Sequence, residues 1–179
     1  MSELFDDEFK QMNEREFEKD MVIKEAVSIT DPIQTLEKQP MHKVKLGTSI
    51  AKIITKFQEK HTACVLVTSS DGKLEGIFTE RDIIRKLVGK GLNHKAELVD
   101  NYMTPNPDTL LMNDPIAFAL NRMYDGGYRH VPIVDENNVP VGLVSILDIV
   151  SHLAKYYSDA ILNLPPDPMR KAQARPEGG

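Results

Sequence analysis

An eight-residue pattern occurs twice in this chain, and the repeat constrains the fold more than any other feature. Residues 76–83 read Gly-Ile-Phe-Thr-Glu-Arg-Asp-Ile, and residues 142–149 read Gly-Leu-Val-Ser-Ile-Leu-Asp-Ile. In each copy a short apolar strand leads to a hydroxyl residue, and an aspartate three positions later opens an apolar-periodic helix, as at many helix starts. A helix cap alone could explain either copy. It does not explain why every matched residue of the two copies is separated by the same 66 positions. The sequence therefore predicts a duplicated fold.

The repeat extends well beyond these two copies. Apolar positions match apolar positions without a gap from about residue 42 to 88 against 108 to 154. Hydrophobic periodicity and turn residues predict strands at 44–46, 63–68, 74–78, 109–112, 131–134 and 141–144, and helices at 49–60, 80–89, 115–124 and 147–157. Each half alone has too little apolar surface to fold comfortably. We expect an α/β (α+β) fold in which two β-α-β-β-α repeats pack with pseudo-two-fold symmetry and form two equivalent clefts.

The two ends of the chain lie outside the repeat. Residues 1–28 predict an N-terminal helical extension, since Phe5, Phe9 and Met12 fall on one helical face. This helix either packs on its own body or a second subunit, or docks another protein, and the sequence leaves both open. Its nine acids and four bases carry the whole net charge of −5, so the repeated body is close to neutral and does not exclude an anionic ligand. Residues 160–179 are expected to form a proline-rich, extended or disordered tail.

Composition and missing motifs narrow the function. A hydrophobic content of 41% and a charged content of 27% are typical of soluble globular proteins. No apolar run is long enough to span a bilayer, so we expect no membrane association. The single cysteine, Cys64, cannot form an internal disulfide, which fits a reducing compartment, so we expect a cytoplasmic protein. The acidic net charge argues against DNA binding. The five histidines have no metal-ligand spacing, and neither phosphate-loop nor nucleophile motifs occur, so we expect neither a metal site nor an enzyme.

The repeated pattern resembles the cystathionine-β-synthase (CBS) domain. The lead-in Met103-Thr-Pro105 and the segment Val131-Pro-Ile-Val-Asp135 support the same resemblance. It implies a tandem pair, with one CBS repeat over residues 32–92 and a second over 98–157. Such pairs are typically regulatory modules that bind adenine nucleotides, although other members bind NAD-like ligands, S-adenosylmethionine or cyclic dinucleotides. They often assemble as flat dimers.

The resemblance assigns roles to the aspartates and hydroxyls of the repeat. Asp82 and Asp148 would each bind ribose hydroxyls, for which a carboxylate that accepts two hydrogen bonds is well suited. Each could instead be only a first-turn acid that stabilises its helix. Thr79 and Ser145 would be plain N-caps or anion sites, and both roles are compatible.

Further positions would contact the phosphate and the base. The resemblance places Arg81 on a phosphate, which a guanidinium fits well. The second copy has Leu147 at the matched position, so Arg129 and His130 would supply the positive charge in the second cleft, unless they only end a strand in solvent. Thr104, Pro105 and Asn106 would offer backbone groups to adenine in that second cleft, between apolar walls formed by Val131 and Ile133, and Lys38 takes the corresponding place in the first copy. The two clefts should therefore differ in charge and affinity.

Two functions remain open. The first is a ligand-sensing regulatory module that binds AMP, ADP or ATP, requires no cofactor, forms a homodimer and signals to a protein partner. The alternative is a structural dimerisation or protein-interaction module with vestigial clefts.

Overall fold

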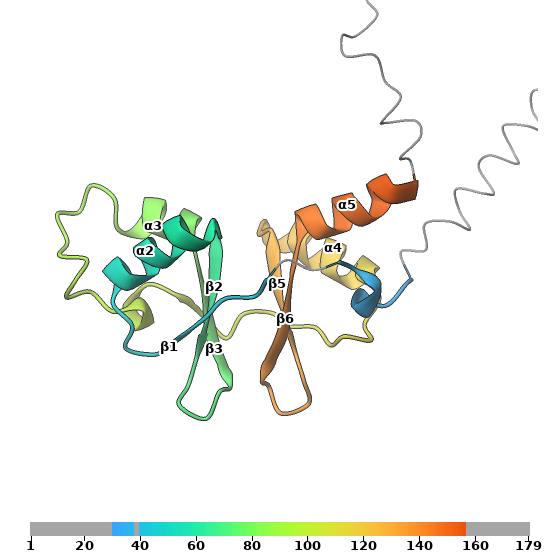
Figure 1. The fold of residues 1–179 in the computed structure, drawn as a ribbon, viewed down its shortest axis with the longest axis horizontal. Helices are drawn as coiled ribbons and strands as arrows, with labels where there is room; N and C mark the ends of the chain where they lie inside the picture. Colours follow the sequence, from blue (N-terminus) through green and yellow to red (C-terminus); the bar gives the residue numbers. More distant parts are fainter. Residues whose placement is uncertain (1–29, 38–39, 157–179) are drawn as a thin grey trace, which may run out of the picture.

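The computed structural model describes residues 30–37 and 40–156. Its elements follow the predicted order in both halves (Figure 1). The first half contains a 3-10 helix η1 (Ile33–Thr35), β1 (Lys43–Lys45), α2 (Ile50–Lys60), β2 (Cys64–Thr68), β3 (Leu74–Thr79) and α3 (Glu80–Lys86). The second contains η2 (Val99–Asn101), β4 (Thr104–Pro105), α4 (Ile116–Gly126), β5 (His130–Val134), β6 (Pro140–Ser145) and α5 (Ile146–Tyr156).

Two antiparallel hairpins, β2–β3 and β5–β6, stand side by side at the centre of the molecule. In Figure 1, α2 and α3 flank the first hairpin, and α4 and α5 flank the second. The first hairpin belongs to a four-stranded sheet of order β1-β2-β3-β4, in which β1 and β2 are parallel, whereas β5 and β6 form a sheet of their own. The mixed α and β architecture and its internal duplication are those that the sequence predicts.

Alternation along β2 shows how the two halves share a core. Val65 and Val67 join the helix-side cluster around Phe78, while Cys64 and Leu66 join a second cluster that includes Val134 of the other half. Successive side chains of a strand point to opposite faces. Every residue of β2 is therefore buried, because one face packs against helices and the other against the second hairpin.

The segment that precedes each half, which we call its lead-in segment, packs against the other half. These segments are residues 31–36 for the first half and 99–105 for the second. The Ile33 amide donates to the Asp114 carbonyl at 2.9 Å, and Ile33 packs in the apolar core of the second half. Conversely, the Val99 amide donates to the Thr48 carbonyl at 2.9 Å, and β4 extends the sheet of the first half. Each half is thus completed by a segment of the other.

The structure differs from the predicted elements in three places. Helix α3 ends at Lys86, three residues before the predicted end. The strand predicted at 109–112 is wrong: Leu110 forms an isolated bridge with Ile133, and the Leu111 amide then donates to the Asp114 carboxylate at 2.7 Å, which turns the backbone away. Strand β4 and the two short 3-10 helices have no apolar periodicity and were not predicted. The predicted N-terminal helix over 1–28, the tail over 160–179 and Lys38 lie outside the described residues.

Within the described ranges, none of the helices combines the length and the apolar character needed to cross a membrane.

Candidate functional site

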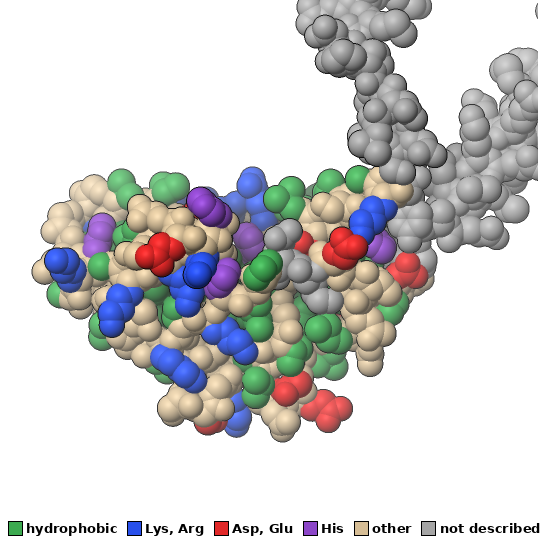
Figure 2. All heavy atoms as spheres, viewed as in Figure 1, with side chains coloured by type: hydrophobic (Ala, Val, Ile, Leu, Met, Phe, Trp, Pro, Cys, Tyr) green, Lys and Arg blue, Asp and Glu red, His purple; other side chains and the backbone are tan. Residues whose placement is uncertain are grey.

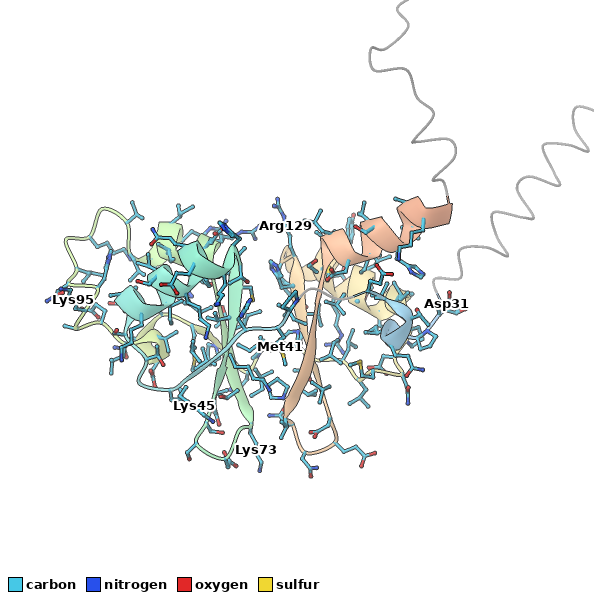
Figure 3. The ribbon with its side chains drawn as sticks, in the orientation of Figure 1. Asp31, Met41, Lys45, Lys73, Lys95 and Arg129 are labelled. Carbon is cyan, nitrogen blue, oxygen red and sulfur yellow. The ribbon has the colours of Figure 1, made fainter. Side chains whose placement is uncertain are left out.

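A cleft of about 610 Å³ opens where the two halves meet. Three segments line it: the start of α3, the chain around β4, and the loop that joins α4 to β5. Figure 3 shows Arg129 at the upper edge of the molecule between the two hairpins. The described lining residues are Ala63, Ile77, Thr79, Glu80, Arg81, Asp82, Arg85, Lys86, Thr104, Asn106, Pro107, Asp108, Gly126, Gly127, Tyr128, Arg129 and His130.

Thr79 and Asp82 form a reciprocal capping box at the start of α3. The carboxylate Oδ2 of Asp82 accepts hydrogen bonds from the Thr79 amide at 2.9 Å and from the Thr79 hydroxyl at 2.7 Å. The Thr79 hydroxyl in turn accepts from the Asp82 amide at 3.4 Å. These bonds fix the carboxylate orientation before any ligand arrives.

The other carboxylate oxygen of Asp82 faces a lysine. Lys86 Nζ lies 2.8 Å from Asp82 Oδ1 and also donates to the Tyr102 carbonyl at 2.6 Å. An ionised carboxylate has about four lone-pair positions, of which Thr79 uses two and Lys86 one. Asp82 Oδ1 can therefore still accept a hydrogen bond from a ligand hydroxyl.

Arg81 links the two halves across the cleft. Its Nη1 donates to the Gly127 carbonyl at 2.7 Å, at the point where α4 ends. Gly127 adopts the left-handed conformation with φ of 65°, which ends the helix and suits a glycine. A carbonyl orients a guanidinium but does not neutralise its charge, so Arg81 keeps its full positive charge.

The cleft carries a small surplus of positive charge, because four arginine and lysine residues line it against three acids, Glu80 included. Asp82 is paired with Lys86, and Asp108 is paired with Arg122 at 3.3 Å. Among the residues that the structure describes, Arg85 and Arg129 have no ion-pair partner. Guanidinium groups without carboxylate partners, together with Arg81, suit an anionic ligand.

Strand β4 brings backbone groups to the cleft, and residues of the first half beside it add apolar surface. Thr104 pairs with Ile77 of β3, and the Asn106 amide donates to the Glu75 carbonyl at 3.0 Å. Asn106 has φ of 45°, a left-handed conformation that asparagine tolerates better than most residues. Ile77 and Ala63 add apolar surface, so the cleft offers polar and apolar groups side by side.

Two titratable groups from the second half border the cleft. Burial lowers the pKa of His130, Asp148 opposes this shift, and the charges of Arg129 and Arg81 lower it further. Burial and the hydrogen bond to Asp108 raise the pKa of Tyr128 to about 12. At neutral pH His130 is therefore largely neutral, and the Tyr128 hydroxyl keeps its proton and donates to Asp108 at 2.8 Å.

The structure brings most of the predicted site residues together, but in a different grouping. Thr79, Arg81, Asp82, Thr104, Asn106, Arg129 and His130 line this one cleft, and Pro105 lies in β4 between two of them. The predicted grouping of the Thr104 segment with Asp148 is wrong, because β4 pairs with β3 and lies beside Asp82. Arg129 and His130 line the same cleft as Arg81, and the charge of Arg81 acts on His130.

Ser145 and Asp148 form a second capping box with the same geometry. Asp148 Oδ2 accepts from the Ser145 amide at 2.7 Å and from its hydroxyl at 2.8 Å, and Asp148 is only 4% exposed. Val131 and Ile133 are fully buried in the core cluster of the second half, so they are not walls of the described cleft.

Sequence reasoning missed Arg85, Lys86 and Tyr128. Lys86 follows Asp82 by four residues on a helix, a spacing that favours an ion pair and could have indicated it. Tyr128 reaches the cleft through the loop after α4, and no sequence pattern marks it.

The described residues include no group of three or more His, Cys, Asp or Glu side chains that could hold a metal ion. Cys64 is buried, and burial together with the charge of Asp82 raises the pKa of its thiol to about 12. A buried thiol with a raised pKa is a poor nucleophile at neutral pH.

Relatives with known sequences share the pattern. The chain is 33% identical over 126 residues to the CBS domain-containing protein CBSCBSPB1 of Arabidopsis thaliana, covering 70% of this chain but only 22% of that protein. It is 30% identical over 110 residues to a 17.7 kDa protein of Acidianus ambivalens, covering 62% of this chain and 65% of that relative. The chain thus spans only part of these relatives.

Solved structures share the fold. A CBS-domain containing protein of Agrobacterium tumefaciens matches with a TM-score of 0.62 and 28% identity, covering 69% of this chain and 93% of that one. A CBS domain protein of Pyrobaculum aerophilum, solved in complex with AMP, matches with a TM-score of 0.61 and 26% identity, covering 69% of this chain and 98% of that one.

The family model described as "CBS domain" matches residues 22–89 and 99–155, one match for each half of the repeat. The chain therefore belongs to the CBS-domain family and carries two CBS domains in tandem.

Proposed function

We propose that this protein is a regulatory module that binds an adenine nucleotide in the cleft between its halves. One observation carries the proposal: Asp82, the backbone around β4, and the charges of Arg81, Arg85 and Arg129 surround a single cleft. These groups match the three parts of a nucleotide, and about 610 Å³ lies within the usual range for small-molecule sites.

Each part of the ligand has a candidate partner. The adenine ring would lie against Ile77, with its polar edge toward the backbone of Thr104 and Asn106. A ribose hydroxyl would donate to Asp82 Oδ1, the oxygen that the capping box leaves available. The phosphates would lie among the guanidinium groups, whose planar forks fit phosphate oxygens. A relative from Pyrobaculum aerophilum was solved in complex with AMP, which supports an adenine nucleotide as the class of ligand.

The ligand would act by bridging the halves. Arg81 extends from α3 to the Gly127 carbonyl, so a phosphate that attracts this guanidinium competes with a contact between the two CBS domains. The ligand would thereby change how α3 meets the end of α4, and a protein partner would sense the change. We propose that this signalling requires no cofactor and no turnover, and a product assay with ATP tests the latter.

The test compares matched aspartate variants by thermal unfolding with AMP, ADP and ATP. Asp82→Asn and Asp148→Asn weaken equivalent capping boxes, so both lower the melting temperature without ligand. The nucleotide that binds best, at a hundred times its dissociation constant, stabilises the wild type by about 2.7 kcal/mol. We expect Asp82→Asn to lower the affinity for that nucleotide by about 10- to 100-fold, because it removes a hydrogen bond to a charged group.

Asp148→Asn should keep the affinity within about twofold, since Asp148 lies outside the described cleft. Equal losses in the two variants, or unchanged binding in Asp82→Asn, would contradict the assignment of Asp82 to the ribose.

We further infer that two copies associate through α3 and α5. Ile84 on α3 and Leu147 on α5 are each 69% exposed, and Val88 and Val150 are exposed beside them. Figure 1 shows both helices on the side of the molecule away from the hairpin turns. Exposed apolar side chains gathered on one side of a chain indicate an interaction surface.

Sedimentation analysis tests the dimer. Ile84→Glu combined with Val150→Glu should convert a dimer to a monomer, because burying two carboxylates without partners is unfavourable. Val141→Glu on β6, also exposed, is the control and should leave the dimer intact. If the double variant keeps the mass of the wild type, the dimer does not use this surface. If it becomes monomeric but binds nucleotide as before, the two proposals are independent.

A further inference from the structure

Five lysines gather on one face of the first half, away from the nucleotide cleft. Lys43 and Lys45 are exposed on β1, and Lys52, Lys56 and Lys60 follow one another at four-residue spacing on α2. Residues four apart share one face of a helix. Figure 2 shows Lys and Arg side chains on this side of the first half, and Figure 3 labels Lys45 beside β1. We call these five residues the lysine face.

Backbone carbonyls hold three of the ammonium groups in place. Lys43 Nζ donates to the Pro140 carbonyl at 3.0 Å, and Lys56 Nζ donates to the Lys43 carbonyl at 3.0 Å. Lys45 Nζ donates to the Ser69 carbonyl at 2.6 Å. A carbonyl accepts one N–H of an ammonium group but leaves its charge intact, and each ammonium has three donors. The lysine face therefore presents oriented, unneutralised positive charge.

A shallow hollow of about 420 Å³ lies among these lysines. Lys43, Lys45 and Lys56 line it together with Thr48 and Thr68. No carboxylate of the described chain lines the hollow, and no lysine of the face is in an ion pair with a described residue. Glu59 shares α2 with three of the lysines, but it too forms no ion pair with them.

The fold does not require this concentration of charge. At the spacing of the internal repeat, the five lysines match Thr109, Leu111, Phe118, Arg122 and Gly126 of the second half. Only one of those five is basic, yet the second half forms the equivalent helix α4. Like charges four residues apart destabilise a helix. An unpaired row of lysines therefore indicates an anionic partner.

We propose that the acidic N-terminal segment of the same chain, residues 1–28, docks on the lysine face. This segment holds nine acids and four bases and has a net charge of −5, whereas the rest of the chain is neutral. The segment is the largest concentration of negative charge in the sequence, and the lysine face is the matching concentration of positive charge. Carboxylates of the segment would accept the N–H groups that the carbonyls leave available.

The chain is long enough for this contact. The described part begins at Thr30, which lies on the second half, while the lysine face lies on the first. A segment of 28 residues spans about 42 Å as the predicted helix and about 90 Å when extended, against a radius of gyration of about 14 Å expected for the described part of the chain. Because the segment is covalently attached to the domain, its carboxylates remain at a high local concentration near the lysine face.

Zero-length carbodiimide cross-linking of the full chain, followed by peptide mass spectrometry, tests the contact. This reagent joins a carboxylate to an amine only when the two touch. At low salt we expect cross-links from acids of residues 1–28 mainly to Lys43, Lys45 and Lys56, and a severalfold loss of yield at 1 M salt, where screening is strong. Mixing isotope-labelled and unlabelled protein distinguishes links within one chain from links between chains.

Matched lysine variants provide the control. Lys52→Gln with Lys60→Gln removes two charges from the lysine face, whereas Lys90→Gln with Lys95→Gln removes two exposed charges from the loop after α3. The first pair should reduce the cross-links to Lys45 severalfold, and the second should leave them unchanged. Circular dichroism confirms that both variants are folded.

Three results would overturn the proposal. Cross-links spread evenly over all exposed lysines would mean that the segment does not choose this face. Cross-links to the lysine face that join only different chains would assign the contact to a second copy. Equal cross-link yields in the two variant pairs would show that the charges of the lysine face do not attract the segment. None of these results depends on nucleotide binding.

Discussion

Asp82 and Asp148 show, at the scale of single residues, how two matched positions acquire different properties. Both accept two hydrogen bonds from their own cap. Asp82 also meets Lys86 at 2.8 Å and lines the cleft, whereas Asp148 is buried beside His130. The sequence motif fixes the cap, but neighbours from distant parts of the chain decide what else each carboxylate can bind.

His130 should make the fold sensitive to acid. Burial lowers its pKa below the ordinary value of 6.5, with Asp148 opposing and with Arg129 and Arg81 adding to the shift. Just below pH 6.5 the unfolded chain therefore binds more protons at this residue than the folded chain does. The free energy of unfolding therefore decreases as the pH falls from 6.5 toward the lowered pKa of His130 in the folded state.

Urea unfolding between about pH 5.5 and 7.5 measures this dependence. We expect His130→Gln to flatten the pH dependence of the free energy of unfolding. Burial and nearby lysines also lower the pKa of His42, so His42→Gln is the comparison variant. An unchanged slope in His130→Gln would show that this histidine does not govern the acid response.

At the scale of elements, the close approach of β3 and β4 depends on a glycine. A Cβ added to Gly76 would collide with the Met103 side chain and lie 3.0 Å from the Thr104 carbonyl oxygen. At the matched Gly142, the nearest atom to an added Cβ is Ile133 Cβ at 3.4 Å, a much milder contact. Gly76 therefore allows β4 to form a wall of the cleft.

Gly76→Ala should displace β4 and weaken nucleotide binding by about tenfold or more, because small shifts of a binding group are costly. Gly142→Ala, the matched control, should bind as the wild type does. Calorimetric titration with the preferred nucleotide measures both affinities. Equal affinities in the two variants would mean that the position of β4 does not matter to the ligand.

Strand β4 also shows where sequence reasoning stops. The apolar periodicity of residues 50–57, where Ile50, Ile53 and Phe57 are buried, predicts α2 closely. Thr104–Pro105 is only two residues long and has no alternation, so nothing local marks it as a strand. It pairs because Gly76, nearly thirty residues earlier, leaves room for it.

At the scale of the whole molecule, the crossed lead-in segments decide which residues share a site. The repeat, its helices and its central strands are predictable, because burial alternates with the periods of helix and strand. The crossing is not predictable, because it depends on contacts such as that of Ile33 with Asp114, more than eighty residues away. Thr104 and Asn106 therefore share a cleft with Asp82, whereas the sequence alone grouped them with Asp148.

The same crossing makes the cleft a joint between the two CBS domains. Its residues come from α3, from the lead-in of the second domain and from the loop before β5. A ligand in this position contacts both domains at once, so its binding energy depends on their relative placement. This is the physical basis on which we expect the protein to act as a sensor.

A crystal structure of the chain grown with AMP tests the central claim most directly. We expect the ribose within hydrogen-bonding distance of Asp82, the base against β4, and the phosphate among Arg81, Arg85 and Arg129. A nucleotide seated instead against Ser145 and Asp148, or an empty cleft at saturating AMP, would contradict it.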